Sequence, residues 1–242
     1  MTDRRPAADV GVPRPAGGRL PRRLAQLAVG LVLYAFSITV LVHSELGNMP
    51  WDVLSQGASR RTGWSLGVLT VLISLVVLAC WIPLRQRPGF GTVANVLVIG
   101  ALVDPFLAVL GRLPDPLPLW AAAALAVGGI GLNGLATALY IGARMGPGPR
   151  DGLMTGLVRR TGRPVGVVRT GIEVAVVAVG WVLGGTLGFA TLAYALGIGP
   201  VVHALLPRLT VPVEDGAPHP PVPPVSDDVR VPGTGSPRPL GT

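Results

Sequence analysis

Two short segments hold the side chains that could do chemistry, and the second is close to a copy of the first. The segments cover residues 50–63 and 149–162, and each has a proline at its start and an aspartate two positions later. Proline suits the first position of a helix, and the helix dipole stabilises an acidic side chain in the first turn. Each segment therefore predicts a short helix that begins with a carboxylate able to take up a proton. The four candidate site residues are Pro50, Asp52, Pro149 and Asp151.

Neither helix is long enough to cross a bilayer, because a span needs about 20 apolar residues. Gly63 and Gly162 are suitable C-caps, so each helix is expected to end there. Two placements remain open. In the first, the helices lie flat at the interface, with Trp51 and Leu54 toward lipid and the paired arginines toward phosphates. In the second, they dip into the membrane from opposite sides and their tips meet near its middle, as broken helices do in transporter binding sites.

Ionisable residues within apolar stretches are a second sign of function, because they are costly in lipid. Glu173 lies four positions after Arg169, so the two are expected to form an ion pair on one helix face. This pair is either a self-neutralised structural feature or, through Glu173, a group that couples transport to protons. Asp104 and its counterpart His203 lie either deep in their spans or in contact with water. Asn133 is expected to form hydrogen bonds between helices.

The sequence offers little support for catalysis. It contains none of the local motifs of zinc proteases, serine hydrolases or phosphate-binding loops. Its one cysteine, Cys80, leaves no internal disulfide and no cysteine-based metal cluster. We expect a protein that is not an enzyme and that uses no cofactor and no metal.

The composition places most of the chain in lipid. Half of the 242 residues are hydrophobic and 13% are charged, whereas a soluble domain carries roughly 25% charged residues. The net charge of +8 is not taken as a sign of nucleic acid binding, because the arginines cluster in tails and loops beside apolar stretches, as topology signals do. Six stretches approach the length and hydropathy of transmembrane helices. They are residues 24–43, 66–84, 92–110, 119–143, 165–183 and 187–206.

The apolar part is an internal duplication with an offset of 99 residues. Gly47 aligns with Gly146, and the Arg-Arg-Thr-Gly run that begins at Arg60 aligns with the run that begins at Arg159. Because each copy holds three spans, the second copy must enter the membrane upside down relative to the first. The expected fold is therefore an all-α membrane protein with six transmembrane helices in two inverted-topology three-helix repeats. Each repeat adds one short helix, interfacial or re-entrant.

The arginine distribution sets the expected orientation. With the N-terminus inside, only Arg60, Arg61 and Arg112 lie on the outer side, in line with the positive-inside rule. We expect a multi-pass inner-membrane protein with both termini cytoplasmic. The ends of the chain, rich in proline, glycine and charge, are expected to be disordered. The resulting divisions are a basic tail at 1–23, repeats at 24–111 and 119–207, and a proline-rich tail at 210–242.

Three short blocks of sequence resemble the YczE-like bacterial membrane proteins, which are related to the YitT group. The blocks are Leu46, Gly47, Pro50, Trp51, Asp52, Val53 and Leu54, then Thr62, Gly63 and Gly67, then Gly91, Thr92 and Asn95. The resemblance covers roughly residues 25–207 and implies a polytopic inner-membrane protein of mostly unassigned function. The second half departs from the pattern, since Arg150 replaces Trp51 and Tyr194 replaces Asn95.

Taken together, these patterns predict a small permease or exporter of an unidentified small molecule, with the lipid bilayer and that molecule as its partners. The alternative is a non-transporting scaffold or accessory protein that binds another membrane protein, which a sealed core without a polar cavity would favour. Glycine-rich faces on the fourth and sixth spans allow helices to approach closely and leave a homodimer open.

Overall fold

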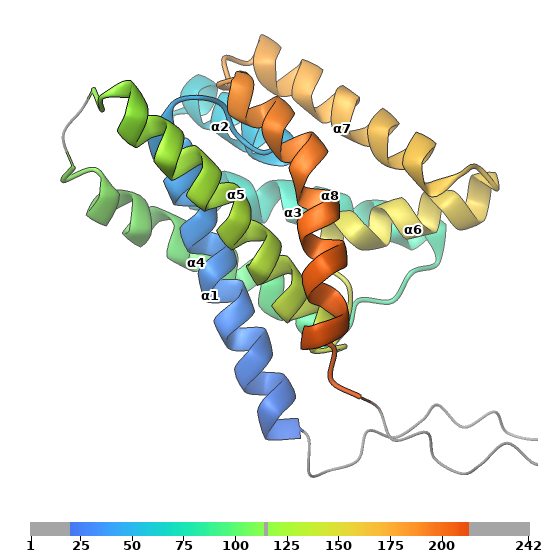
Figure 1. Cartoon of the computed structure of the whole chain (residues 1–242). Helices are drawn as coiled ribbons and strands as arrows, with labels where there is room; N and C mark the ends of the chain where they lie inside the picture. Colours follow the sequence, from blue (N-terminus) through green and yellow to red (C-terminus); the bar gives the residue numbers. More distant parts are fainter. Residues whose placement is uncertain (1–19, 114–115, 213–242) are drawn as a thin grey trace, which may run out of the picture. The chain divides into compact units, whose positions relative to one another are not determined.

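The computed structural model describes residues 20–113 and 116–212, and every regular element within them is an α-helix. The described helices belong to one compact unit (Figure 1). The predicted tails lie outside the described residues, apart from 20–23 and 210–212. The helices are α1 (Leu20–Ser44), α2 (Pro50–Thr62), α3 (Leu66–Leu84), α4 (Phe90–Leu110), α5 (Leu119–Gly142), α6 (Pro149–Thr161), α7 (Val165–Val182) and α8 (Phe189–Leu209).

Six of the described helices are long and apolar enough to cross a membrane, which confirms the number of predicted spans. They are α1, α3, α4, α5, α7 and α8. α1 begins at Leu20, earlier than predicted, and its first turn is anchored by Arg23, which donates from Nε to the carbonyl of Ala143 at 2.8 Å. At the other end, Val211 follows α8, is buried, and donates its N–H to the carbonyl of Gly142 at 3.0 Å. Both terminal stretches thus belong to the helical unit.

The two short helices have the predicted ends. α2 and α6 are each 13 residues long, and each has its proline at the start. Gly63 and Gly162 follow them with φ angles of 74° and 66°, in the left-handed conformation that closes a helix. The aspartates fall in the first turn of each helix, as predicted.

The packing interleaves the first and second halves of the chain. α1 and α5 pack against each other, α4 packs on α1, and α8 packs on α5. Figure 1 shows α1 (blue) and α5 (green) side by side. Each short helix packs mainly on a long helix of the other half, α2 on α7 and α6 on α3. The apolar core includes Leu31, Ile38, Leu41 and Val103.

One helix pair differs between the halves. α3 packs against α4, whereas α7 and α8 lack a comparable contact. A Cβ added to Gly67 would overlap the carbonyl oxygen of Gly100, and a Cβ on Gly100 would overlap Val71. At the equivalent positions of the second half, Gly166 and Gly199, an added Cβ would meet no described atom within 4 Å. α7 therefore stands away from α8.

Candidate binding cavity

A break in the backbone precedes each short helix, and the opposite half of the chain holds it in place. Gly47 and Gly146 have φ angles of 119° and 124°, which glycine adopts without strain. The carbonyl just before Gly47 accepts the N–H of Ala190 at 2.9 Å, at the start of α8. The carbonyl just before Gly146 accepts the N–H of Gly91 at 2.7 Å, at the start of α4. Each short helix thus begins at a point fixed by the other half.

The first turns of α2 and α6 meet inside the helical unit. Arg150 Nη2 donates to Asp52 Oδ1 at 3.2 Å, and the guanidinium carbon of Arg150 lies 5.3 Å from the centroid of the Trp51 ring. Asp52 is only 1% exposed. An ion pair and a cation–π contact therefore join the two tips. The meeting of the tips is one part of the dipping placement, and the position of these helices relative to the bilayer stays a prediction.

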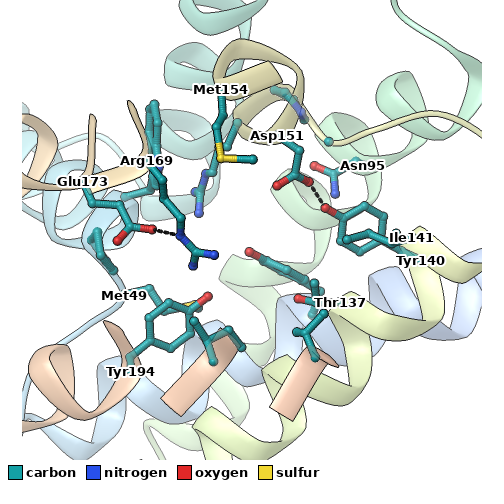
Figure 2. Close-up of a pocket in the computed structure, with 18 of the residues that line it drawn as sticks. Met49, Asn95, Thr137, Tyr140, Ile141, Asp151, Met154, Arg169, Glu173 and Tyr194 are labelled. Atoms are coloured by element: carbon teal, nitrogen blue, oxygen red, sulfur yellow. Dashed lines mark hydrogen bonds and ion pairs between the residues drawn. The ribbon is translucent and has the colours of Figure 1, made fainter. Parts of the chain in front are cut away.

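A cavity of about 410 Å³ lies beside this contact. Small-molecule sites are typically about 300 to 1,000 Å³. All eight described helices contribute to its wall. Figure 2 shows Asp151 and Tyr140 on one side of the cavity and Arg169 and Glu173 on the other. The cavity thus brings ionisable side chains from three helices, together with aromatic rings, around one space.

The predicted site residues come together here, although one of them is not part of the wall. Four of them line the cavity, namely Pro50, Pro149, Asp151 and Glu173. The fifth, Asp52, is buried and pairs with Arg150, which does line the cavity.

The charged groups of the cavity differ in how they are paired. Arg169 Nε donates to Glu173 Oε1 at 2.8 Å, which is the predicted ion pair. Tyr140 donates its hydroxyl to Asp151 Oδ2. Within the described part of the chain, Asp151 has no ion-pair partner. One carboxylate of the wall is therefore held by a neutral donor rather than by a cation.

Burial acts on the two aspartates of the short helices. It raises the pKa of the Asp151 carboxyl, while the hydrogen bond from Tyr140 and the charges of Arg150 and Arg169 oppose this rise. Burial also raises the pKa of the Asp52 carboxyl against the opposing effect of Arg150. Among the described residues, Asp52 Oδ2 is buried without a hydrogen-bond partner. Both carboxyls therefore take up a proton more readily than an exposed aspartate does.

Several residues of the wall lie outside the site predicted from the sequence. They are Tyr34, Tyr140, Tyr194, Arg150 and Arg169. The sequence did single out Arg150 and Tyr194, since they are the two positions at which the second half departs from the repeated pattern. No sequence pattern singled out Tyr34 and Tyr140, because only the packing of α1 on α5 brings them together.

Other polar residues of the spans serve mainly to join helices. Asn133 of α5 accepts a hydrogen bond from the Tyr194 hydroxyl of α8 at 2.9 Å and donates to α1, which confirms its predicted role. Asp104 accepts the N–H of Gly67 at 2.9 Å, in the first turn of α3. Its counterpart His203 lines the cavity.

These features define the class: a polytopic, all-helical membrane protein with a charged and aromatic cavity where two short helices meet. The chain belongs to a family of unknown function (DUF6198), which matches residues 21–207.

Three relatives are similar along most of their length. The chain is 39% identical over 184 residues to an uncharacterized protein of Haemophilus influenzae, covering 74% of this chain and 83% of the relative. It is 30% identical over 181 residues to the uncharacterized membrane protein YczE of Bacillus subtilis, with 74% and 83% covered. It is 26% identical over 180 residues to the uncharacterized protein YyaS of the same organism, with 74% and 90% covered. The resemblance to YczE-like proteins is thereby confirmed. No solved structure matches the chain.

Proposed function

We propose that the chain is a small-molecule permease or exporter that carries its substrate through the cavity at the tips of α2 and α6. The observation that carries this proposal is the pairing of Asp52 with Arg150, which holds two half-length helices together at one charged space. Inside a bilayer, broken backbone and charge are tolerated only against protein or water. A cavity walled by Asp151, Arg169 and Glu173 suits a transport site and does not suit a sealed scaffold.

The proposal includes an inverted-repeat arrangement in the inner membrane, with both termini cytoplasmic. It is supported by the sequence offset of 99 residues and by contacts exchanged between the halves. Arg60 at the end of α2 donates to the carbonyl of Gly184 at 2.6 Å, just after α7. Arg160 at the end of α6 donates to the carbonyl of Pro83 at 3.0 Å, at the end of α3. Such reciprocity fits two related halves that face each other across a shared centre.

The difference between the helix pairs suggests how access alternates. α7 stands away from α8, and the cavity extends between them to Arg169 and Leu206. α3 packs closely on α4 through Gly67 and Gly100. If the halves exchange these arrangements, α7 closes on α8 while α3 leaves α4, and the cavity opens on the other side. The two tips stay together in both states.

The cavity should therefore be reachable from both faces of the membrane, and labelling tests this without a known substrate. In a Cys80→Ser background, Met154→Cys puts one thiol in the cavity wall. We expect a membrane-impermeant maleimide to label it in right-side-out and in inverted vesicles. Val127→Cys, on an exposed position of a span, serves as the control that stays unlabelled in lipid. Labelling of Met154→Cys from one face only, or from neither, would count against transport and for a scaffold.

A further inference from the structure

The cavity holds one carboxylate that no arginine balances. Asp52 and Glu173 each pair with an arginine, Arg150 and Arg169 respectively. Asp151 has no such partner in the described part of the chain and receives a tyrosine hydroxyl instead. With these five groups ionised and His203 of the wall uncharged, three carboxylates, one of them Asp52 behind the wall, stand against two guanidiniums, so the cluster carries one excess negative charge. A ligand with one positive charge would make the cluster neutral.

The wall around that carboxylate is aromatic to an unusual degree for this chain. The chain has three tyrosines, and all of them, Tyr34, Tyr140 and Tyr194, line this one cavity. The rings of Tyr34 and Tyr140 lie 6.1 Å apart at an interplanar angle of 76°. Tyr140 is also the residue whose hydroxyl holds Asp151. Aromatic rings near an anionic group are the usual surroundings of an ammonium ion in proteins.

We infer that the cavity binds a small organic cation, an amine or quaternary ammonium, with Asp151 as its counter-charge and the tyrosine rings as its walls. This inference rests on the proposed function, because it names the substrate class of that same site. The ammonium lies against Asp151, where it replaces the missing cation. The apolar body of the ligand lies between the rings and the side chains of Met154 and Ile198, which also line the cavity.

Arg169 also faces the cavity, but its positive charge is compatible with a cationic ligand. Its Nε is taken by Glu173, and the two form a neutral pair. Its terminal nitrogens have no hydrogen-bond partner among the described residues, so they can donate to a neutral oxygen of the ligand. A carboxylate ligand would instead raise the excess negative charge of the cluster from one to two. The arginine can thus hold a polar group at the far end of a cation that carries one, and an apolar end does not need it.

Three probes with the same body and different charge test the inference. Phenethylamine is a cation, phenylalanine is a zwitterion, and 3-phenylpropionate is an anion. Calorimetry on the full-length protein in nanodiscs, at mildly alkaline pH, should give binding of phenethylamine at least about tenfold tighter than binding of the other two. Tightest binding of phenylalanine or 3-phenylpropionate would overturn the inference. So would no binding of phenethylamine at millimolar concentration.

Variants separate the role of Asp151 from a general effect on folding. Asp151→Asn should lose at least about tenfold in phenethylamine affinity, while Asp151→Glu, which keeps the charge, should retain most of it. Unchanged affinity in Asp151→Asn would overturn the assignment, and the comparison of the three probes on the unaltered chain holds even where a variant fails to fold. Labelling of Met154→Cys uses no ligand. Labelling from both faces without phenethylamine binding would therefore reject the cation and leave transport standing.

Discussion

The pairing of Asp52 with Arg150 is the ion pair that ties the two short helices together. Asp52 is almost fully buried, and the Arg150 side chain is 23% exposed. A buried ion pair gives little net stability compared with apolar packing, but the loss of one partner leaves the other charge uncompensated. Its main effect is therefore to specify that these two tips meet and in what register.

Removal of one partner of this ion pair should lower the free energy of unfolding more than removal of both. We expect Asp52→Ala to lower the free energy of unfolding by on the order of 3 kcal/mol, because it leaves the Arg150 guanidinium without its partner. The double variant with Arg150→Met should recover part of that loss. Unfolding in detergent, followed by circular dichroism, measures both. Additive losses in the double variant would mean that the two side chains do not interact.

The protonation of Asp151 should control the binding of a cation. Because burial raises its pKa, against Tyr140, Arg150 and Arg169, the proton is taken up at a higher pH than by an exposed aspartate. Affinity for phenethylamine should be full above that pKa and should fall as the pH drops through it. Calorimetry between about pH 4 and pH 8 covers the range around the ordinary aspartate value. Asp151→Asn is the control, and its weak binding should show no such pH dependence.

At the residue scale, the sequence pointed to the acidic residues in and beside the cavity wall and missed most of its other side chains. Asp52, Asp151 and Glu173 could be found because a charge in an apolar chain is costly and therefore conspicuous. Arg150 was harder to assign, since an arginine beside a span is also an ordinary topology signal. Tyrosines of spans, such as Tyr34, carry no local signal at all. Their convergence depends on helix packing, which one sequence does not specify.

At the scale of elements, α2 and α6 lie close against their neighbours through glycines, α2 against the backbone of α7 and α6 against side chains. A Cβ on Gly57 of α2 would overlap the carbonyl oxygen of Gly180 of α7, and a Cβ on Gly156 of α6 would press on Leu84. Both glycines occupy the same place in the repeated pattern. Tight packing of this kind uses small residues where helices lack a strong hydrophobic drive to associate.

Gly57→Ala should therefore be far more harmful than an alanine elsewhere on the same pair of helices. Overpacking typically costs about 1–3 kcal/mol, and here the obstacle is backbone, which cannot rotate away. Gly171→Ala on α7 is the matched control, because its Cβ would meet no described atom within 4 Å. Alanine there should be neutral or stabilising by up to about 1 kcal/mol. Melting temperatures of the two variants in the same detergent give the comparison, and equal values would contradict this packing.

The elements themselves were largely predictable. Long apolar stretches fix the six long helices, and the proline starts and glycine ends fix α2 and α6, because these signals are local. The placement of the two short helices could not be predicted, since the sequence fits both a flat and a dipping position. The contacts that position the starts of these helices within the helical unit come from the opposite half, as when the carbonyl before Gly146 accepts the N–H of Gly91. Long-range partners of this kind leave no mark in the local pattern.

At the scale of the whole helical unit, the proposed inverted arrangement makes a direct prediction about sidedness. Arg60 and Arg159 are equivalent in the repeat, and both are exposed. In a Cys80→Ser background, Arg60→Cys should react with an impermeant maleimide from outside and Arg159→Cys from the cytoplasm. Labelling of both from the same face would rule out opposed halves, because two inverted copies must place equivalent residues on opposite sides.

The exchange of helix arrangements is the most demanding prediction for the whole unit, and one residue pair tests it. Val71 contacts the site of Gly100 where α3 packs on α4. The equivalents in the second half are Thr170 and Gly199, and the surroundings of Gly199 are open. Thr170→Cys with Gly199→Cys, in a Cys80→Ser background, should therefore form a disulfide only when α7 closes on α8.

Oxidation of that double variant should trap the closed state of the second half. In a variant that also carries Met154→Cys, we expect oxidation to abolish labelling of this third thiol from the cytoplasmic face and to leave or increase its labelling from the outside, because the cavity then opens between α3 and α4. Reduction should restore both. A disulfide that never forms, or one that leaves access from both faces unchanged, would mean that the gap between α7 and α8 is a fixed feature of the fold. The two halves would then differ permanently, and access could not alternate by exchanging their conformations.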